Sequence, residues 1–279
     1  MGKKVASPGA QVPFDVLVAF TASVARALKK GASMPAAFFG ARSATPMDRV
    51  ASEALTPVCT GVDEAFRQPA PPKPPKKELV SRVPPEEKDL PANMPAALKK
   101  SVLQKEGRKE FDLDDGNDDR LSKTLKKFSN IFDQIYLAVV TGGEFGEDLP
   151  AAFERLALYF GREQKLRGRE GASNAPEAAL CSLYRFFARI DMTIAGRVPI
   201  LDAMALVAQE LPDPYKKAVL DARQALSMGG DSFSSSLEPS KLFSGEDISE
   251  MRAGEVGGCL DRTFRERADL YAERLAINP

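Results

Sequence analysis

Residues 141–149 read TGGEFGEDL, and residues 252–260 read RAGEVGGCL. Both stretches contain the frame Gly-Glu-x-Gly-x-x-Leu, and a phenylalanine follows each at the same distance, Phe153 in the first and Phe264 in the second. A repeat of this length predicts two copies of one helical unit. We therefore expect a surface that the chain builds twice, not a single catalytic pocket.

The overall composition is that of a globular protein with charged helices. Hydrophobic residues make up 43% of the 279 residues and charged residues 28%, which suits one large domain or two ordinary ones. The 39 basic and 39 acidic side chains give zero formal net charge. Because nucleic-acid binding usually needs a net basic face, nucleic acid is not expected as the main partner.

Residue types that serve catalysis and metal binding are scarce. The chain has no histidine, which is the commonest general base and transition-metal ligand. Its three cysteines, Cys59, Cys181 and Cys259, are far apart and form no Cys-x-x-Cys motif, so neither a zinc site nor a redox pair is expected. Single thiols of this kind are typical of a reducing compartment and of small buried apolar side chains. No metal, cofactor or catalytic residue is predicted.

No apolar stretch is long enough to cross a membrane. The stretch from Phe14 to Ala27 is similar to a secretory signal, but Asp15 interrupts it and the amphipathic pattern continues to Leu28, so a helix is expected there. No run approaches the roughly 18 uninterrupted apolar residues of a transmembrane helix. The sequence thus predicts a chain that does not span a membrane.

Helical spacing of apolar residues dominates the N-terminal part of the chain. After a polar tail over residues 1–12, helices are predicted from Phe14 to Leu28, after Pro35, and over residues 47–66. Because proline lacks an amide donor, Pro57 is expected to interrupt or kink the third of these helices.

Residues 69–120 differ in character from the rest of the chain. They are rich in proline and end in an acidic run, so we predict a largely disordered insertion with a short helix over residues 96–104. Its lysines set among prolines, Lys73, Lys76 and Lys77, are typical of a linker; a ligand for an SH3-like groove or for an acidic surface is the alternative.

The acidic run does not have the pattern of a calcium-binding loop. A loop counted from Asp112 would need glycine and glutamate where the chain has Asn117 and Lys123. A solvated acidic run is therefore predicted.

The remainder of the chain also predicts helices. One is expected from Leu121 to Val139, ended by Gly142-Gly143, and further ones over residues 149–160, 183–194, 200–211, 214–228, 242–253 and 260–275, with a polar connector over 161–176. In the last helix, one stripe is formed by Leu260, Phe264, Arg267/Ala268, Tyr271 and Leu275. Since no segment alternates with a period of two, the predicted class is all-α, with two antiparallel helical bundles of about six helices each.

Three motifs resemble the F domain of type II secretion systems, which is shared with the platform protein of type IV pilus systems. They are residues 195–204 (AGRVPILDAM), Leu242-Phe243 and residues 252–261 (RAGEVGGCLD). The resemblance covers residues 183–275 well, and residues 14–66 with 121–162 more weakly as a first copy. The expected organisation is a disordered tail (1–12), a first F-domain-like bundle (13–68 plus 121–165), the insertion (69–120), a connector (166–176) and a second bundle (177–279).

The resemblance implies a non-enzymatic assembly module at the cytoplasmic face of the inner membrane. Such a protein would bridge an assembly ATPase to membrane assembly components and self-associate. Family members carry membrane helices after each bundle, whereas residues 161–176 are polar here, so a cytoplasmic or peripheral protein is expected. A helical scaffold or regulator that keeps the fold outside a secretion machine is the alternative.

The repeated motif supplies the candidate site residues, Gly143, Glu144, Gly146, Gly254, Glu255 and Gly257. One interpretation is a turn, in which the glycines take positive φ and the carboxylate meets the dipole of the helix that follows. The other is an exposed contact point. A carboxylate enzyme would need Glu144 and Glu255 to converge in one cleft with raised pKa values, which a repeat disfavours.

A second motif is structural. Gly31 and Pro35 in the first copy are expected to match Gly196 and Pro199 in the second, with the first connection one residue longer.

Overall fold

The computed structural model describes residues 12–67, 120–146, 148–168, 175–229 and 232–278, and every regular element within these ranges is helical. The all-α prediction is therefore confirmed. The described helices belong to one compact unit, which comprises Met1–Arg67 and Asp119–Pro279. The predicted insertion, its short helix over 96–104 and nearly all of the predicted N-terminal tail lie outside the described residues.

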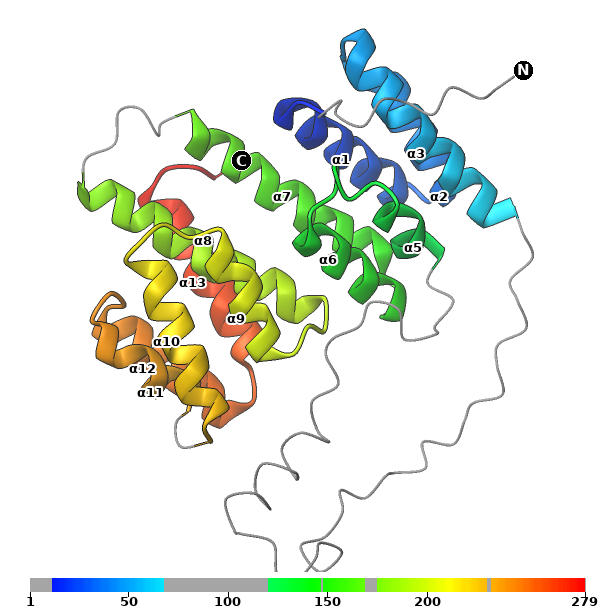
Figure 1. Cartoon of the computed structure of the whole chain (residues 1–279). Helices are drawn as coiled ribbons and strands as arrows, with labels where there is room; N and C mark the ends of the chain where they lie inside the picture. Colours follow the sequence, from blue (N-terminus) through cyan, green and yellow to red (C-terminus); the bar gives the residue numbers. More distant parts are fainter. Residues whose placement is uncertain (1–11, 68–119, 147, 169–174, 230–231, 279) are drawn as a thin grey trace, which may run out of the picture. The chain divides into compact units, whose positions relative to one another are not determined.

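The helices fall into two sets, which we call the first half (residues 12–67 and 120–168) and the second half (residues 175–278). The first half contains α1 (Phe14–Lys29), α2 (Met34–Ala44), α3 (Arg49–Arg67), α5 (Arg120–Lys126), α6 (Gln134–Phe145) and α7 (Leu149–Arg167). The second half contains α8 (Ala175–Ala195), α9 (Ile200–Gln209), α10 (Tyr215–Ser227), α11 (Phe233–Leu237) followed by a 3₁₀ turn over Glu238–Ser240, α12 (Gly245–Gly257) and α13 (Leu260–Arg274) (Figure 1).

The same helix pairings occur in both halves. In the first half α1 packs against α2 and α7, and the chain of neighbours runs α2, α3, α5, α6, α7. In the second half α8 packs against α9 and α13, and the chain runs α9, α10, α11, α12, α13. The repeat read from the sequence is thus a repeat of the whole helical arrangement.

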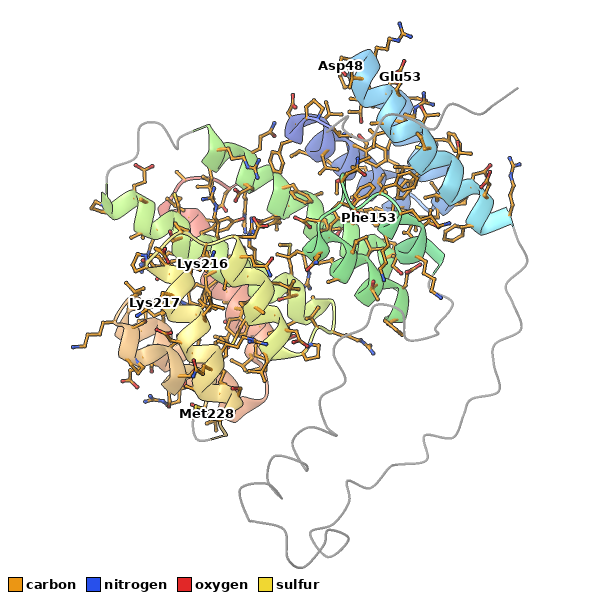
Figure 2. The ribbon with its side chains drawn as sticks, in the orientation of Figure 1. Asp48, Glu53, Phe153, Lys216, Lys217 and Met228 are labelled. Atoms are coloured by element: carbon orange, nitrogen blue, oxygen red, sulfur yellow. The ribbon has the colours of Figure 1, made fainter. Side chains whose placement is uncertain are left out.

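Aromatic side chains fill the core of each half. In the first half the ring of Phe153, labelled in Figure 2, lies 5.9 Å from that of Phe38 and 6.2 Å from that of Tyr136. In the second half the ring of Phe187 lies 5.1 Å from that of Phe186 and 5.6 Å from that of Tyr271. Such pairs contribute about 0.5–1.5 kcal/mol each beyond their buried area. The aromatic residues of both halves are thus accounted for by packing in the core.

Neither Pro57 nor Gly142-Gly143 ends a helix. Pro57 is expected to interrupt or kink its helix, and α3 runs across it without interruption. Helix α6 likewise continues through Gly142-Gly143 to Phe145. The prediction that these glycines end the helix is wrong because both are buried within α6, where they allow neighbouring helices to approach closely.

Other elements also differ from the prediction. The expected helix over residues 121–139 is two helices, because the carboxylate of Asp133 accepts a 2.7 Å bond from the amide of Tyr136 and starts a new helix there. Helix α7 extends past Gly161 to Arg167, so the polar connector is shorter than predicted. The short helix α11 was not predicted, since its five residues are too few for a periodic pattern.

The connection from the first to the second helix is equally long in both halves, spanning residues 30–33 and 196–199. After α1, Gly31 has φ 82° and Ala32 N donates to Ala27 O at 3.1 Å. After α8, Arg197 has φ 59° and Val198 N donates to Thr193 O at 3.0 Å. Both are Schellman-type helix ends.

Gly31 therefore corresponds to Arg197, and the expected pairing of Gly31 with Gly196 is wrong by one residue. The prolines also differ in position. Pro35 lies in the first turn of α2, whereas Pro199 is the N-cap of α9.

Gly196 has a different role, at the crossing of α6 and α8. A Cβ atom on Gly142 would lie 2.5 Å from Cα of Gly196, and one on Gly196 would lie 2.5 Å from the carbonyl oxygen of Ala138. No side chain tolerates such distances, so the backbones of the two halves meet at this glycine pair.

Candidate functional site

The glutamate of the first motif caps a short helix. Glu144 lies in the last turn of α6, and its carboxylate accepts hydrogen bonds from the amides of Leu121 (2.7 Å) and Ser122 (3.0 Å), at the start of α5. The first amides of a helix have no partner within the helix, so a carboxylate placed there satisfies them and interacts favourably with the helix dipole.

The glutamate of the second motif does the same. The carboxylate of Glu255 in α12 accepts hydrogen bonds from the amide of Phe233 and from the amide of Ser234 (3.2 Å), at the start of α11, and also from the Ser234 hydroxyl. The expectation that these carboxylates meet the dipole of the following helix is wrong. In both halves they reach back to the preceding short helix, which lies beside the hairpin.

The first glycine of each motif lets the two helices of the hairpin approach closely. A Cβ on Gly143 would lie 2.7 Å from Cβ of Ala152, and a Cβ on Gly254 would lie within 3.1 Å of the Thr263 side chain. Any larger residue at either position would push α7 away from α6, or α13 away from α12. The first motif glycine is therefore a packing residue.

The expected positive φ is wrong for the motif glycines. Gly143, Gly254 and Gly257 lie within helices, and Gly146 has φ −82°. In the second hairpin the residue with left-handed backbone is Gly258, with φ 66°. It follows Gly257, the motif glycine for which positive φ is expected.

The first variable position of the motif holds an exposed apolar residue in both copies. Phe145 is 40% exposed and Val256 is 87% exposed, and both occupy the x of Gly-Glu-x-Gly. We call these two residues the hairpin tips. Sequence reasoning overlooked them because the frame was defined by its constant residues, and an exposed apolar residue in a variable position gives no periodic signal.

The two glutamates are not arranged as an acid–base pair. Each is engaged by backbone amides of its own half. Among the described residues, no group of three or more Cys, Asp or Glu side chains is placed to hold a metal ion.

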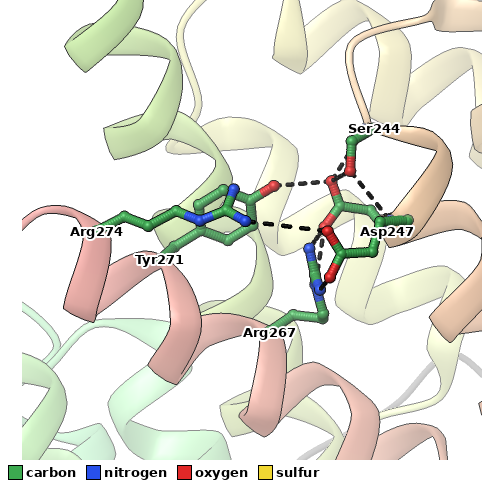
Figure 3. A network of polar contacts seen from close by, with 6 residues as sticks. Ser244, Asp247, Arg267, Tyr271 and Arg274 are labelled. Atoms are coloured by element: carbon green, nitrogen blue, oxygen red, sulfur yellow. Dashed lines mark hydrogen bonds and ion pairs between the residues drawn. The ribbon is translucent and has the colours of Figure 1, made fainter.

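A buried polar network lies between α12 and α13 in the second half (Figure 3). Asp247 is fully buried, and its Oδ1 accepts bonds from Nε (2.8 Å) and Nη2 (2.6 Å) of Arg267. Its Oδ2 accepts a 2.7 Å bond from the Tyr271 hydroxyl and bonds of 2.9 and 2.7 Å from the amide and hydroxyl of Ser244. Arg267 also pairs with the exposed Glu246 at 2.8 Å. The buried carboxylate is thus fully hydrogen-bonded.

Burial and the neighbouring carboxylate shift the ionisation of this network. Burial, and then the hydrogen bond to Asp247, raise the pKa of Tyr271 from 10.0 to about 12. Burial acts to lower the pKa of Arg267, but its bonds to Glu246 and Asp247 outweigh that effect and raise it. The arginine stays charged and the tyrosine stays neutral at physiological pH.

The equivalent positions of the first half are apolar or aromatic. Glu144 and Glu255 are equivalent residues of the two copies. The same difference in residue number makes Asp247 equivalent to Tyr136, Arg267 to Leu156 and Tyr271 to Phe160. The rings of Tyr136 and Phe160 stack at 5.8 Å, and Leu156 is fully buried. One backbone arrangement therefore holds an ionic core in one copy and an aromatic core in the other.

The two halves are joined by charged side chains of α7. Arg162 of α7 pairs with Asp269 of α13 at 2.7 Å. Glu163, which is buried, pairs with Arg185 of α8 at 2.7 Å. Tyr159 accepts a 2.6 Å bond from Nε of the buried Arg189. We call this surface of α7 with α8 and α13 the seam.

A cavity of about 450 Å³ lies at one end of the seam, lined in part by Phe14, Tyr159, Glu163, Arg189 and Glu210. Its charged groups already have partners, since Arg189 also pairs with Glu210 at 2.9 Å. This cavity offers no nucleophile beside a base.

The cysteines differ in exposure. Cys59 is buried, and burial raises the pKa of its thiol to about 11. Cys181 is half-buried and Cys259 is exposed. The expectation of three buried thiols is therefore confirmed for Cys59 alone, and the exposed Cys259 is the N-cap of α13.

Comparison with known proteins gives one family match. A family model described as type II secretion system (T2SS), protein F, matches residues 186–278, from within α8 to just beyond α13. No curated protein matches the chain. No described helix is both long enough and apolar enough to cross a membrane.

Proposed function

We propose that this protein, whose residues 186–278 form a domain of the type II secretion system F family, is a non-enzymatic assembly module. It would bridge an assembly ATPase to inner-membrane components of a secretion or pilus machine, at the cytoplasmic face, and associate with further copies of itself. The family match carries the proposal. The second set of helices with the same pairings supports it, because a duplicated surface suits a partner that is itself an oligomer.

The hairpin tips are the proposed contact points. Phe145 and Val256 are apolar, exposed and equivalent, and the buried core of a protein interface is more apolar than the rest of the surface and enriched in aromatic residues such as Phe. The motif glycines and Glu144 and Glu255 would act indirectly, by holding each tip on a capped and closely packed hairpin.

Such a module would act mechanically: a movement of one part would displace another part, and no reaction would be catalysed. Each tip is connected to the core of its half through a hairpin, and the halves are connected through the glycine crossing and the ion pairs of α7. A force applied at one tip would therefore reach the other half through buried contacts.

The proposal is tested by crosslinking in the native host. The full chain, untagged, is fractionated from cells, crosslinked and analysed by mass spectrometry. We expect recovery with the inner membrane and crosslinks from the hairpins to a secretion or pilus ATPase. Recovery as a free protein without such crosslinks would favour the alternative, a helical scaffold outside a secretion machine.

Variants identify the surface. Phe145→Asp and Val256→Asp should each abolish or strongly reduce the crosslinks while leaving helix content unchanged. Val50→Asp is the matched control, because Val50 is a 50% exposed valine at the start of α3, a helix that belongs to neither hairpin. Unchanged crosslinks in the double tip variant would show that the tips are not the contact.

A further inference from the structure

We infer that the two halves are hinged: the second half turns on the first at the crossing of α6 and α8, and polar contacts along the seam hold the closed arrangement. The chain passes from one half to the other only once, between α7 and α8. All three cysteines are free, so no disulfide adds a second covalent connection. The inference does not depend on the proposed assembly role.

Each half has an aromatic core of its own. Among the described residues, every contact between two aromatic rings joins rings of the same half. Tyr136 and Phe153 connect the first core, and Phe187 and Phe264 connect the second. Because burial of apolar surface is the main stabilising contribution to a fold, each half can stay folded when the other half moves.

The seam differs from these cores in its chemistry. Side chains of α7 bind side chains of α8 across it through ion pairs and hydrogen bonds, which join Arg155 to Asp191, Glu163 to Arg185 and Tyr159 to Arg189. Charged groups that separate are hydrated again, whereas apolar groups that separate are exposed to water at a cost. Domains that meet through a small, polar interface are therefore expected to move relative to each other.

The seam is also less tightly packed than a core. Two cavities, of about 450 and 260 Å³, are each lined by residues of both halves. The interior of a domain is close-packed and contains few voids larger than a water molecule. The halves thus touch along the seam without the interlocking side chains that would fix their relative position.

The glycine crossing is suited to be the pivot. The backbones at Gly142 and Gly196 lie so close together that a Cβ atom on either residue would come within 2.5 Å of the opposite backbone. Side chains that interdigitate fix the angle between packed helices, but glycine has none. The two backbones can therefore turn on each other at this point while they stay in contact.

The residues after α13 fasten the second half to α7. Residues 276–278, which we call the strap, lie next to the C-terminal part of that helix. The side-chain oxygen of Asn278 accepts a 3.0 Å bond from Nη2 of Arg162, and its backbone carbonyl accepts a bond from Nζ of Lys165. Because Arg162 also binds Asp269 of α13 at 2.7 Å, one residue of the first half holds two segments of the second.

These contacts can be broken without great cost. Lys165 and Asn278 are exposed, and the side chain of Asp269 is 47% exposed. Exposed ion pairs contribute little to stability and are screened by salt. Loss of all three contacts should raise the ratio of open to closed molecules by about tenfold.

Pulsed electron–electron double resonance on the full chain tests the hinge. Spin labels are attached to Cys259 in the second half and to Ser43→Cys in the first, both at exposed positions of the structure, in a Cys59→Ala/Cys181→Ala background. We expect one main distance at low ionic strength and a second, longer distance that becomes more populated as potassium chloride is added.

Variants assign the opening to the contacts across the seam. Arg162→Gln/Lys165→Gln should raise the population of the longer distance by about tenfold at the same ionic strength. Lys29→Gln is the matched control, because Lys29 also pairs with a residue of α7, Glu154 at 2.8 Å, but within the first half. It should leave the distances unchanged, and equal opening in this control would contradict the assignment.

Two further label pairs separate a hinge from local unfolding. Cys259 with Lys216→Cys lies within the second half and should keep a single distance in every variant. Phe145→Cys with Pro199→Cys, each three residues from a glycine of the crossing, should move much less than the pair that joins the distant parts of the halves. A spread of distances within the second half, or equal movement beside the crossing, would overturn the hinge. So would a single, unchanged distance between the halves in Arg162→Gln/Lys165→Gln at high ionic strength, which would show that they form one rigid body.

Discussion

Replacing Arg267 with leucine tests how strongly the buried network depends on its arginine. Two nitrogens of Arg267 contact Oδ1 of Asp247 at 2.8 and 2.6 Å, and the Asp247 side chain is fully buried. In Arg267→Leu the carboxylate keeps only its bonds to Tyr271 and Ser244. Breaking a buried pair by removing one partner costs about 3–5 kcal/mol, a large share of the roughly 5–15 kcal/mol that stabilises a typical domain.

Urea unfolding followed by circular dichroism measures this cost. Arg262→Leu is the control, since Arg262 is an exposed residue of the same helix, and we expect it to change stability by no more than about 0.5 kcal/mol. In Asp247→Asn/Arg267→Leu the buried group is neutral, so the double variant should be at least about 1 kcal/mol more stable than Arg267→Leu alone. A loss below about 1 kcal/mol in Arg267→Leu, or strictly additive effects, would refute the argument from an uncompensated buried charge.

Three further predictions concern the caps, the helix end and the alkaline limit. Glu144→Ala and Glu255→Ala should each cost about 1–2 kcal/mol in chemical unfolding, because each leaves two helix amides without their acceptor; no loss would mean that water replaces the carboxylate. Arg197→Gly should stabilise by roughly 0.5–1 kcal/mol, since glycine adopts positive φ without strain, and a lower melting temperature would contradict this. The pKa of Tyr271 is raised from 10.0 to about 12 in the folded protein, so its contribution to stability is present below pH 10 and lost as the pH rises towards 12. Urea midpoints across that range should fall less steeply in Tyr271→Phe, and equal slopes would exclude Tyr271 as the group responsible.

The sequence is sufficient to predict the helices that have long apolar stripes. The spacing of Phe14 to Leu28 and the stripe from Phe264 to Leu275 correspond to α1 and α13 almost residue for residue. Arg267 lies on the predicted stripe of the last helix. A charged residue on a buried helix face indicates that a side chain of opposite charge lies beside it in the core. The identity of that partner could not be predicted, because Asp247 lies on a different helix and reads as an ordinary first-turn carboxylate.

The glycines were harder to interpret for a physical reason. A glycine that ends a helix and a glycine that lets two helices touch look alike in a sequence, and only the tertiary neighbour distinguishes them. Gly142 and Gly143 lie inside α6 because Gly196 and Ala152 approach them.

The residues that the two copies have in common indicate which surface could bind a partner. Both keep the packing glycine, the capping glutamate and the exposed apolar tip, while the buried network of the second copy is replaced by aromatic packing in the first. The shared residues that face inward are explained by the geometry of the hairpin alone, so their recurrence is no evidence of contact with a partner. Neither the helix caps nor the close glycine contacts involve Phe145 or Val256, so the tips are the recurring side chains that are left for contact with a partner.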